Sequence, residues 1–480
     1  MLQIYNTLTR QKEKFDPLQK GKVKMYACGV TVYDYCHLGH ARSLITFDLV
    51  HRYLKFLGYD VTFVRNFTDI DDKIINRANE QGIDYKKLTE KFIAAFYEDT
   101  DALKMERPAI EPKATEHIAE MITLIKGLEQ KGLAYKAGGD VYYSVRGFQG
   151  YGKLSGKNID ELESGSRVDI LESKKDPLDF TLWKGAKPNE PKWDSPWGAG
   201  RPGWHLECSV MSMHYLGETF DIHGGGRDLI FPHHENEIAQ SEGCTQKLFA
   251  KYWLHNGFVN IDAEKMSKSL GNFLTLRDLL KIYTSEELRL FILSAHYRSP
   301  LDYTEKNMKN AVASLERYYQ TRRRLENYLK NTADKKCDPN ILKQVQSLET
   351  QFQDAMGDDF NTAKVVGTIF ELVRNFNKVL DENKPFSKSC LNLFFDTVSK
   401  IDSVMSLFGS TSEEYFSEKK TKGLSKKSLS EKEILEAIAR RKEARQNKDF
   451  AKADQIRDEL AAKGVEVKDN PDGSTSWHVI

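Results

Sequence analysis

The 480-residue chain has no apolar run that approaches the ~18 consecutive residues a membrane-spanning helix needs. Its first residues, Met1 to Lys14, include Arg10, Lys12 and Lys14, and no apolar block follows them. A secretory signal is therefore not expected. We expect a cytoplasmic protein that has no membrane partner.

Close cysteine pairs are also missing. The six cysteines are widely separated, at Cys28, Cys36, Cys208, Cys244, Cys337 and Cys390. This spacing argues against a disulfide framework and against a self-contained zinc finger. Any metal site must therefore be assembled from distant parts of the chain. An excess of one charge is absent as well, since the formal net charge is +1, so composition alone indicates no polyanionic partner.

The pattern of apolar residues predicts an α/β fold. Residues 22–27 are typical of a short strand, and a turn with glycine and histidine and then an apolar-periodic helix follow them. After the break at Gly58-Tyr59, residues 60–65 supply a second strand, as in a parallel βαβ unit. The fold class that we predict is a doubly wound parallel, Rossmann-like catalytic core with an insertion, followed by an α-helical bundle and a small C-terminal domain.

The length allows about three domains of ~150 residues each, and shifts in composition suggest where they divide. Glycine-rich turns and a Pro/Trp-rich tract mark the insertion, while Ser, Lys and Glu without bulky residues mark a linker. The predicted divisions are 1–114, first half of the catalytic domain; 115–201, insertion; 202–260, second half; 261–304, a loop and stem-contact region; 305–409, helical bundle; 410–430, linker; 431–480, C-terminal domain.

The first motif with chemical meaning is His37-Leu38-Gly39-His40, between the first strand and its helix. A strand end and a helix N-terminus together favour a nucleotide, glycine permits close approach, and two imidazoles can donate to phosphate or ribose oxygens. The alternative is a turn whose histidines only cap the helix.

The second motif is Lys265-Met266-Ser267-Lys268-Ser269, in a polar loop after the last predicted strand. The ammonium groups of Lys265 and Lys268 can neutralise the charge that develops on a pyrophosphate leaving group. In this order around an α/β core, the two motifs resemble the two signatures of class I aminoacyl-tRNA synthetases, with leucine as the second residue of the first.

A third cluster predicts a metal site. Pro232-His233-His234-Glu235-Asn236-Glu237 opens a predicted helix, on which His233 and Glu237 share one face. Cys28 ends the first strand and Cys208 precedes the second half of the sheet, so both can converge on that helix. Imidazole, carboxylate and thiolate all bind zinc. Spacing alone leaves His234, Cys36 and Cys244 open as ligands.

A zinc site with thiolates suits a substrate that is selected by its sulfur. Zinc binds a thiol strongly and deprotonates it, whereas serine offers only a hydroxyl group. A site built around one strong contact rejects an analogue that lacks it by roughly 10⁴ or more, so no editing domain is needed. These properties indicate cysteine as the amino acid that is activated.

The chain resembles the bacterial cysteinyl-tRNA synthetases across essentially its whole length. The blocks that carry the resemblance are Tyr5 to Arg10, Tyr26 to Asp34, and Asp221 to Glu242. It implies one Zn²⁺ held by Cys28, Cys208, His233 and Glu237, and a substrate cysteine contacted by Thr68, Trp204, His223 and Asp228. It also implies ATP with Mg²⁺, with His37, Gly39, His40 and Lys268 at the nucleotide, and a monomer that acts on tRNA(Cys).

The C-terminal segment favours a tRNA partner. Residues 417–448 hold eleven Lys/Arg against five Asp/Glu, and the segment resembles the anticodon-reading end of the family. Trp477 can stack on an unpaired base or fill the small domain. Two other functions remain open, namely a cysteine ligase that acts on a small amine and a non-catalytic, zinc-stabilised RNA-binding protein.

Overall fold

The structure is a computed structural model that describes residues 1–159, 174–188, 190–262, 264–265, 274–427, 430–469 and 475–479. Its centre is a sheet of four strands, and every neighbouring pair runs parallel. In spatial order the strands are β10 (Ala250–Asn256), β9 (Phe220–Gly226), β3 (Lys22–Thr31) and β4 (Asp60–Thr68). The doubly wound α/β class predicted from the sequence is confirmed.

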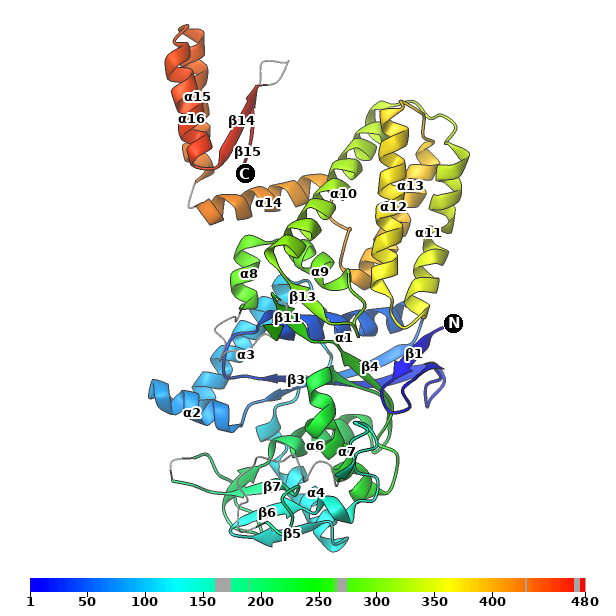
Figure 1. Ribbon diagram of the computed structural model, residues 1–480, viewed down its shortest axis with the longest axis vertical. Coiled ribbons are helices and arrows are strands. Elements are labelled where there is room, and N and C mark those ends of the chain that lie inside the picture. The colour runs from blue at the N-terminus through cyan, green and yellow to red at the C-terminus, as the bar shows by residue number, and fades with distance from the viewer. Residues whose placement is uncertain are drawn as a thin grey trace.

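Helices cover both faces of this sheet (Figure 1). Helix α1 (Leu38–Phe56) joins β3 to β4 and lies on one face, while α6 (Trp204–Leu216) and α7 (Glu235–Thr245) lie on the other. The strands are largely apolar because a parallel sheet is buried on both sides. In β3, for example, Val23, Met25 and Tyr26 have no exposed surface.

The predicted insertion carries its own antiparallel sheet beside α4 (Ile118–Gln130). The strands, in order, are β5 (Ala134–Ala137), β6 (Asp140–Tyr143), β7 (Phe180–Gly185) and β8 (Gly200–Pro202). The β5–β6 hairpin turns at Gly138 and Gly139, where φ values of 59° and 93° require glycine. The sheet and α4 form the end of the molecule opposite the C-terminal region (Figure 1).

Short elements surround the central sheet and lead to the helical region. They are β1 (Gln3–Asn6), β2 (Gln11–Lys14), α2 (Asp72–Gln81), α3 (Tyr85–Ala102), β11 (Val259–Ile261), β12 (Glu264–Lys265), α8 (Leu276–Ile282), α9 (Ser285–Leu293) and β13 (Leu301–Tyr303).

A four-helix bundle follows, as the sequence predicts. It consists of α10 (Glu305–Asn331), α11 (Pro339–Gly357), α12 (Thr362–Asp381) and α13 (Lys388–Met405). Its core includes the apolar stripe of α12, in which Val365, Ile369, Leu372, Val373 and Phe376 are all buried.

The predicted linker at residues 410–430 is wrong over most of its length, because α14 (Ser412–Lys427) occupies it. Helix α14 is held by a few contacts that composition does not reveal. The Tyr415 ring is buried and stacks on Tyr319 with centroids 4.2 Å apart, and the Tyr415 hydroxyl donates to Glu287 at 3.1 Å. Lys419 also pairs with Glu316 at 2.7 Å. One buried aromatic anchor therefore orders a segment that is otherwise polar.

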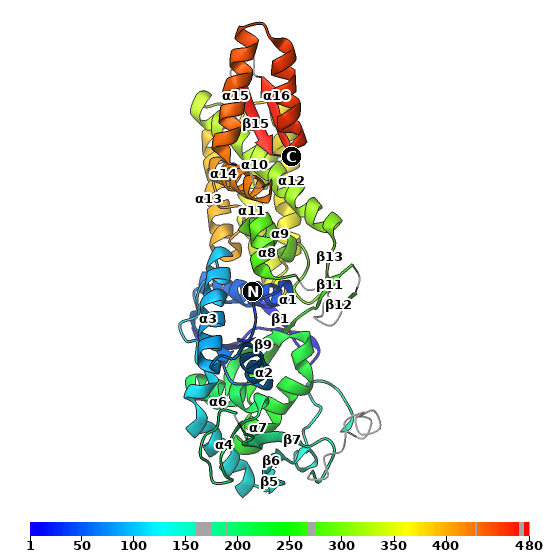
Figure 2. The same ribbon diagram turned by 90° about the vertical axis from the view of Figure 1, so that its left-hand side faces the viewer.

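The C-terminal unit is small and projects from the rest of the chain (Figures 1 and 2). It contains α15 (Glu431–Gln446), α16 (Phe450–Ala462), and the antiparallel strands β14 (Val465–Asp469) and β15 (Thr475–Val479). Its apolar core is small, so an Arg441–Asp469 pair with two hydrogen bonds of 2.8 and 2.9 Å contributes to holding β14 against α15. Among the described residues, no helix combines the length and the apolar character that crossing a bilayer requires.

Candidate active site

The site lies where the order of the strands reverses. Strand β3 pairs with β4 on one side and with the much later β9 on the other, and its pairing with β9 ends at Ala27 and Gly224. Beyond that point the strands separate and leave room at their carboxyl ends. Open α/β sheets bind their ligands at this position.

A bulge in β3 brings Cys28 into this space. Between Ala27 and Val30 the strand contains one residue more than the facing part of β4. The bulge depends on Gly29, whose backbone N–H donates to the Asn66 side chain at 2.9 Å. A Cβ atom at residue 29 would lie 1.6 Å from the carbonyl oxygen of Asn66, so only glycine fits.

The two helices on the same side of the sheet supply the other groups. Cys208 lies in the second turn of α6 and its Sγ is 3.7 Å from Sγ of Cys28. His233 lies in the irregular turn before α7, with Nε2 2.9 Å from Oε1 of Glu237. Ligand atoms of these four residues all lie within 4.8 Å of one another. We call Cys28, Cys208, His233 and Glu237 the thiol tetrad.

A second grouping shares two of these residues. Ligand atoms of Cys28 and Glu237 also lie within 4.8 Å of those of His223 and His234. His234 Nε2 is 3.2 Å from Cys28 Sγ, and His223 Nε2 is 2.6 Å from Glu237 Oε2. His234, which spacing alone left open as a ligand, is therefore part of the site. Neither of the two groups includes Cys36 or Cys244.

The protonation states suit a cation. The hydrogen bond from Cys28 lowers the pKa of the Cys208 thiol to about 6, whereas burial raises the pKa of Cys28. Burial lowers the pKa of His233, but Glu237 and Cys208 together outweigh it and raise the value to about 10. The neighbouring His223 and His233, acting against burial, hold the pKa of Glu237 well below its usual range. A metal ion would replace the protons on these donors.

Further histidines surround the tetrad, and the sequence did not reveal their roles. Nδ1 of His205 is 2.8 Å from Nδ1 of His233. On the other side, Nδ1 of His234 is 2.8 Å from Nε2 of His255, and Nδ1 of His255 is 2.8 Å from the Thr7 hydroxyl. Burial lowers the pKa of His205, His234 and His255, which makes all three neutral. Such outer partners fix the orientation of ligands.

The four residues expected to contact the amino acid lie at different depths. The Trp204 ring stacks on His233 with centroids 4.0 Å apart and keeps 37% of its surface exposed, so it covers the tetrad from the solvent side. Asp228 is exposed in the turn after β9. Thr68 is buried at the end of β4, 3.4 Å from the Asn66 amide, and His223 is fully buried against Glu237.

The His-x-Gly-His turn follows β3 and begins α1. His37 Nδ1 accepts from the backbone N–H of His40, and His40 Nδ1 accepts from that of His37, so the two side chains form a capping box. Their rings stack with centroids 3.6 Å apart. The capping role considered for these histidines is therefore present, at a helix N-terminus that also suits an anion.

Of the second motif, the structure describes only the backbone of Lys265, which ends β12 beside Asn260. Lys268 and the rest of the motif lie outside the described residues. The chain re-enters the described part next to the histidine turn, because Leu38 donates to the carbonyl of Leu274 at 3.2 Å and Leu276 to that of Cys36 at 2.7 Å. Residues 274–276 and the start of α1 are thus joined.

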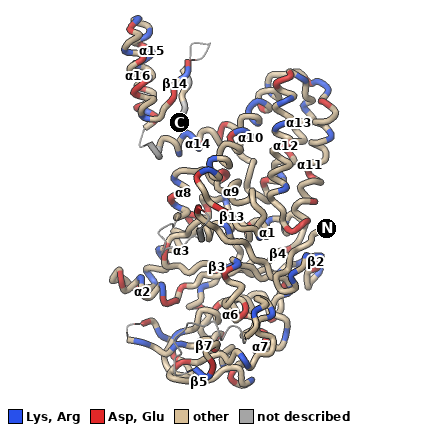
Figure 3. Tube along the Cα trace, in the orientation of Figure 1, with Lys and Arg blue, Asp and Glu red and all other residues tan. Residues whose placement is uncertain are grey.

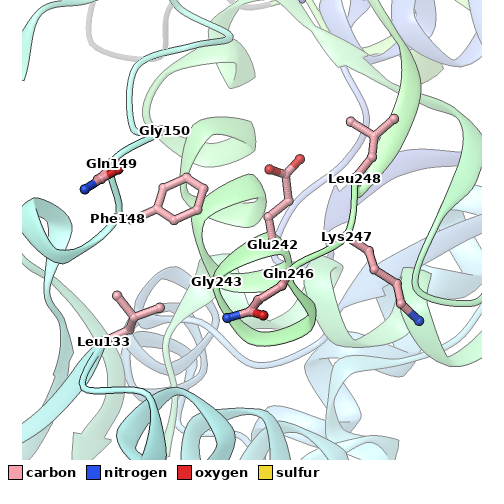
Figure 4. A pocket seen from close by; sticks show the side chains of 9 residues that line it. All are labelled: Leu133, Phe148, Gln149, Gly150, Glu242, Gly243, Gln246, Lys247 and Leu248. Carbon is pink, nitrogen blue, oxygen red and sulfur yellow. The ribbon is translucent and has the colours of Figure 1, made fainter.

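A hollow of about 510 Å³ elsewhere on the surface is separate from this site (Figure 4). It lies at the carboxyl end of α7, between Glu242 and Lys247 of that region and Phe148 of the insertion. The thiol tetrad is at the opposite end of α7 and does not line it. The polar groups of the thiol tetrad are therefore a better guide to the active site than the volume of this hollow.

Comparison with known proteins agrees with this geometry. Residues 14–313 match the family described as the tRNA synthetases class I (C) catalytic domain, 351–409 match the DALR domain, and 432–477 match the cysteinyl-tRNA ligase anticodon binding domain. Methionyl-tRNA synthetase of Mycobacterium tuberculosis, in complex with methionyl-adenylate, shares the fold with a TM-score of 0.60 at 15% identity, over 80% of this chain and 92% of that one.

Sequence relatives extend over the whole chain. The cysteine–tRNA ligase of Geobacter metallireducens is 52% identical over 483 residues, which cover 100% of this chain and 99% of the relative. That of Syntrophotalea carbinolica is 53% identical over 483 residues, covering 99% of each. The catalytic domain and the fold define a class I aminoacyl-tRNA synthetase. Within that class, the chain belongs to the cysteine–tRNA ligase family.

Proposed function

We propose that the chain activates cysteine with ATP and transfers it to the 3′ end of tRNA(Cys). The observation that carries this proposal is the thiol tetrad at the reversal point of a class I synthetase sheet, in a chain that matches cysteine–tRNA ligases from end to end. In the first step the cysteine carboxylate attacks the α-phosphorus of ATP and pyrophosphate leaves. In the second, a terminal ribose hydroxyl of the tRNA displaces AMP.

The tetrad is the group that we propose holds zinc. It offers two sulfurs, an imidazole and a carboxylate, a set that zinc binds well, whereas the alternative group offers one sulfur. The surrounding contacts also favour this choice, because His205 holds the far nitrogen of His233 and His223 holds the far oxygen of Glu237. Zinc bound there would coordinate the substrate thiol as a thiolate, which the hydroxyl of serine matches poorly.

The other residues around the tetrad position the amino acid. Trp204, stacked on His233 and part exposed, closes over the substrate and excludes water. The exposed Asp228 carboxylate is suited to bind the ammonium group of the substrate. Thr68 lies beside Asn66 at the end of β4, where it can form a hydrogen bond with a polar group of the substrate. His223 acts through Glu237, since its Nε2 is committed to that carboxylate.

Nucleotide chemistry is assigned to the two signature motifs. His37, Gly39 and His40 lie at the N-terminus of α1, a position that favours a phosphate group, and we assign them to ATP. Lys265 and Lys268 neutralise the departing pyrophosphate, and Mg²⁺ accompanies the ATP. No side chain acts as a covalent nucleophile, so positioning and charge neutralisation provide the rate acceleration.

The C-terminal unit is the proposed reader of tRNA. Figure 3 shows that α15 and α16 carry charges of both signs. Some of the basic groups are already paired within the protein. Arg441 and Arg445 bind Asp469, and Trp477 packs on the small core beneath Lys420. Trp477 therefore fills the domain, and the exposed Arg440 and Lys442 are better candidates for phosphate contacts.

Reversing the charges of Arg440 and Lys442 is expected to impair the transfer to tRNA and to leave the activation of cysteine unchanged. In the variant R440E/K442E, aminoacylation should fall and become less steeply dependent on salt, since each lost phosphate contact removes about 0.9 from the slope of log K against log salt on a duplex. Cysteine-dependent exchange of pyrophosphate into ATP should be unchanged. The control is the variant E431Q/E436Q, whose substitutions also lie on α15. Its aminoacylation should equal that of the wild type. Unaltered tRNA affinity in R440E/K442E contradicts the assignment.

Pyrophosphate exchange tests the function as a whole. A cysteine ligase of any kind exchanges labelled pyrophosphate into ATP when cysteine is present, whereas a zinc-stabilised RNA-binding protein does not. Charging of tRNA(Cys) then separates a synthetase from a ligase that acts on a small amine. The match over residues 432–477 to an anticodon-binding domain favours the synthetase. Exchange that does not depend on cysteine would overturn the proposal.

A further inference from the structure

A second group of metal-binding side chains lies away from the active site, where the insertion meets α6. His117 immediately precedes α4, Glu120 is in the first turn of α4, and His214 is in the last turn of α6. Glu120 Oε1 is 3.6 Å from Nδ1 of His117 and 3.7 Å from Nδ1 of His214. Ligand atoms of the three residues lie within 4.8 Å of one another.

The buried histidine of this group is oriented but incompletely bonded. The His117 side chain is only 6% exposed, and among the described residues its Nδ1 has no hydrogen-bond partner. Nε2 of the same ring is held by the hydroxyl of Tyr215 at 3.2 Å. This leaves Nδ1 directed toward Glu120 and His214. Histidines that bind metals are oriented in this way, with one ring nitrogen on the ion and the other on a polar partner.

The local charge also favours a cation. The Glu120 carboxylate supplies a negative charge between the two imidazoles. The carboxyl end of α6 adds the partial negative charge of a helix C-terminus. His214 and Glu120 are 44% and 40% exposed at their side chains, so an ion from solution can reach them.

We propose that His117, Glu120 and His214 form a second divalent metal site that takes Zn²⁺ or a similar borderline cation. Two imidazoles and one carboxylate select such ions over Mg²⁺ and Ca²⁺, and three protein ligands leave a position for water. The ion joins α4 of the insertion to the end of α6. The opposite end of α6 carries Trp204 and Cys208, so the site braces the helix that supplies part of the thiol tetrad.

The test uses Zn²⁺ alone, titrated into the full-length protein at pH 7.5 against a chromophoric chelator. The wild type should bind one equivalent more than the tetrad takes, and His214→Ala and Glu120→Gln should each weaken that equivalent by roughly ten- to a hundredfold. Both positions are part exposed, so the fold is retained. The control is Glu218→Gln, an exposed carboxylate just beyond α6 that pairs with Lys247 instead.

The two metal sites can be told apart in the same titration. Cys208→Ser should weaken the equivalent held by the thiol tetrad and keep the second, while His214→Ala should weaken the second and keep that of the tetrad. The inference is overturned if the wild type takes no second equivalent in the micromolar range, or if His214→Ala and Glu120→Gln titrate as the wild type does. Loss of the second equivalent in Glu218→Gln would also contradict it, since that carboxylate lies outside the group.

Discussion

Replacing Cys208 with serine is expected to lower kcat/KM for cysteine in pyrophosphate exchange by roughly a hundredfold or more, with KM for ATP nearly unchanged. The hydrogen bond from Cys28 lowers the pKa of the Cys208 thiol to about 6, which favours its role as a thiolate ligand. A hydroxyl at this position is a far weaker zinc ligand. A hundredfold loss corresponds to about 2.7 kcal/mol of transition-state stabilisation. The same preparation should contain less tightly bound zinc than the wild type.

Cys244→Ser is the matched control for this experiment. Like Cys208, Cys244 lies on an active-site helix, but it is half-buried, lies near the carboxyl end of α7 and belongs to neither metal-binding group around Cys28. Its zinc content and its kinetics with cysteine should equal those of the wild type. Normal cysteine affinity in Cys208→Ser would remove Cys208 from the ligand set, and equal losses in both variants would show only a general sensitivity to cysteine replacement.

Replacing Arg289 with alanine is expected to lower the free energy of unfolding by about 3–5 kcal/mol. Its guanidinium group is fully buried and binds Asp48 of α1 at 3.0 Å, the carbonyl of Leu103 at 3.1 Å and the carbonyl of Met405 at 2.8 Å. These partners lie in α1, after α3 and at the end of α13. Arg289 thus joins the catalytic core to the bundle, and its loss leaves Asp48 with a buried charge that is only partly compensated by Arg52.

Urea unfolding followed by circular dichroism measures this effect as a shift of the transition midpoint. The control is Arg324→Ala on the surface of α10, where the guanidinium group is 42% exposed and pairs with Asp381 at 2.7 Å. An exposed pair of this kind contributes at most about 1 kcal/mol, so the control should unfold close to the wild type. Equal midpoints for Arg289→Ala and Arg324→Ala would show that the buried pair does not couple the two parts.

Much of the fold follows from local patterns in the sequence. The alternation of strand, loop and helix predicted the parallel sheet, and the spacing of apolar residues in α12 predicted the bundle, because burial imposes a period on each element. Helix α14 was missed because a few contacts with distant residues, chiefly the buried Tyr415 ring on Tyr319, order it, and such contacts leave no periodic pattern in the sequence. Composition therefore described residues 410–430 poorly.

The sequence predicted only part of the active site, because the rest depends on contacts between distant segments. The i,i+4 spacing of His233 and Glu237 could be recognised, whereas the choice between His233 and His234 depends on the irregular turn before α7, in which both are buried. Regular helix begins only at Glu235, three residues after the Pro232 predicted to open it. His255 comes from a distant strand, and no spacing links it to His234. His205, three residues before Cys208, could have been found from its helical proximity.

The bulge at Cys28 also could not be predicted. It arises from the register between β3 and β4, and the sequence signal for it is Gly29, which is ambiguous until Asn66 is placed next to it. The register between these two strands, which the sequence does not show, directs Cys28 toward the two helices. This placement is what makes four residues, spread over more than 200 positions, into one candidate site.

The most direct test of the central claim is to measure bound zinc and amino-acid selectivity on one preparation of the wild-type protein. After dialysis against a weak chelator, the active protein should retain tightly bound zinc, and kcat/KM in pyrophosphate exchange should favour cysteine over serine by roughly 10⁴ or more. Full activity in protein that retains no metal, or exchange with serine at a rate similar to that with cysteine, would contradict selection of the substrate through its sulfur.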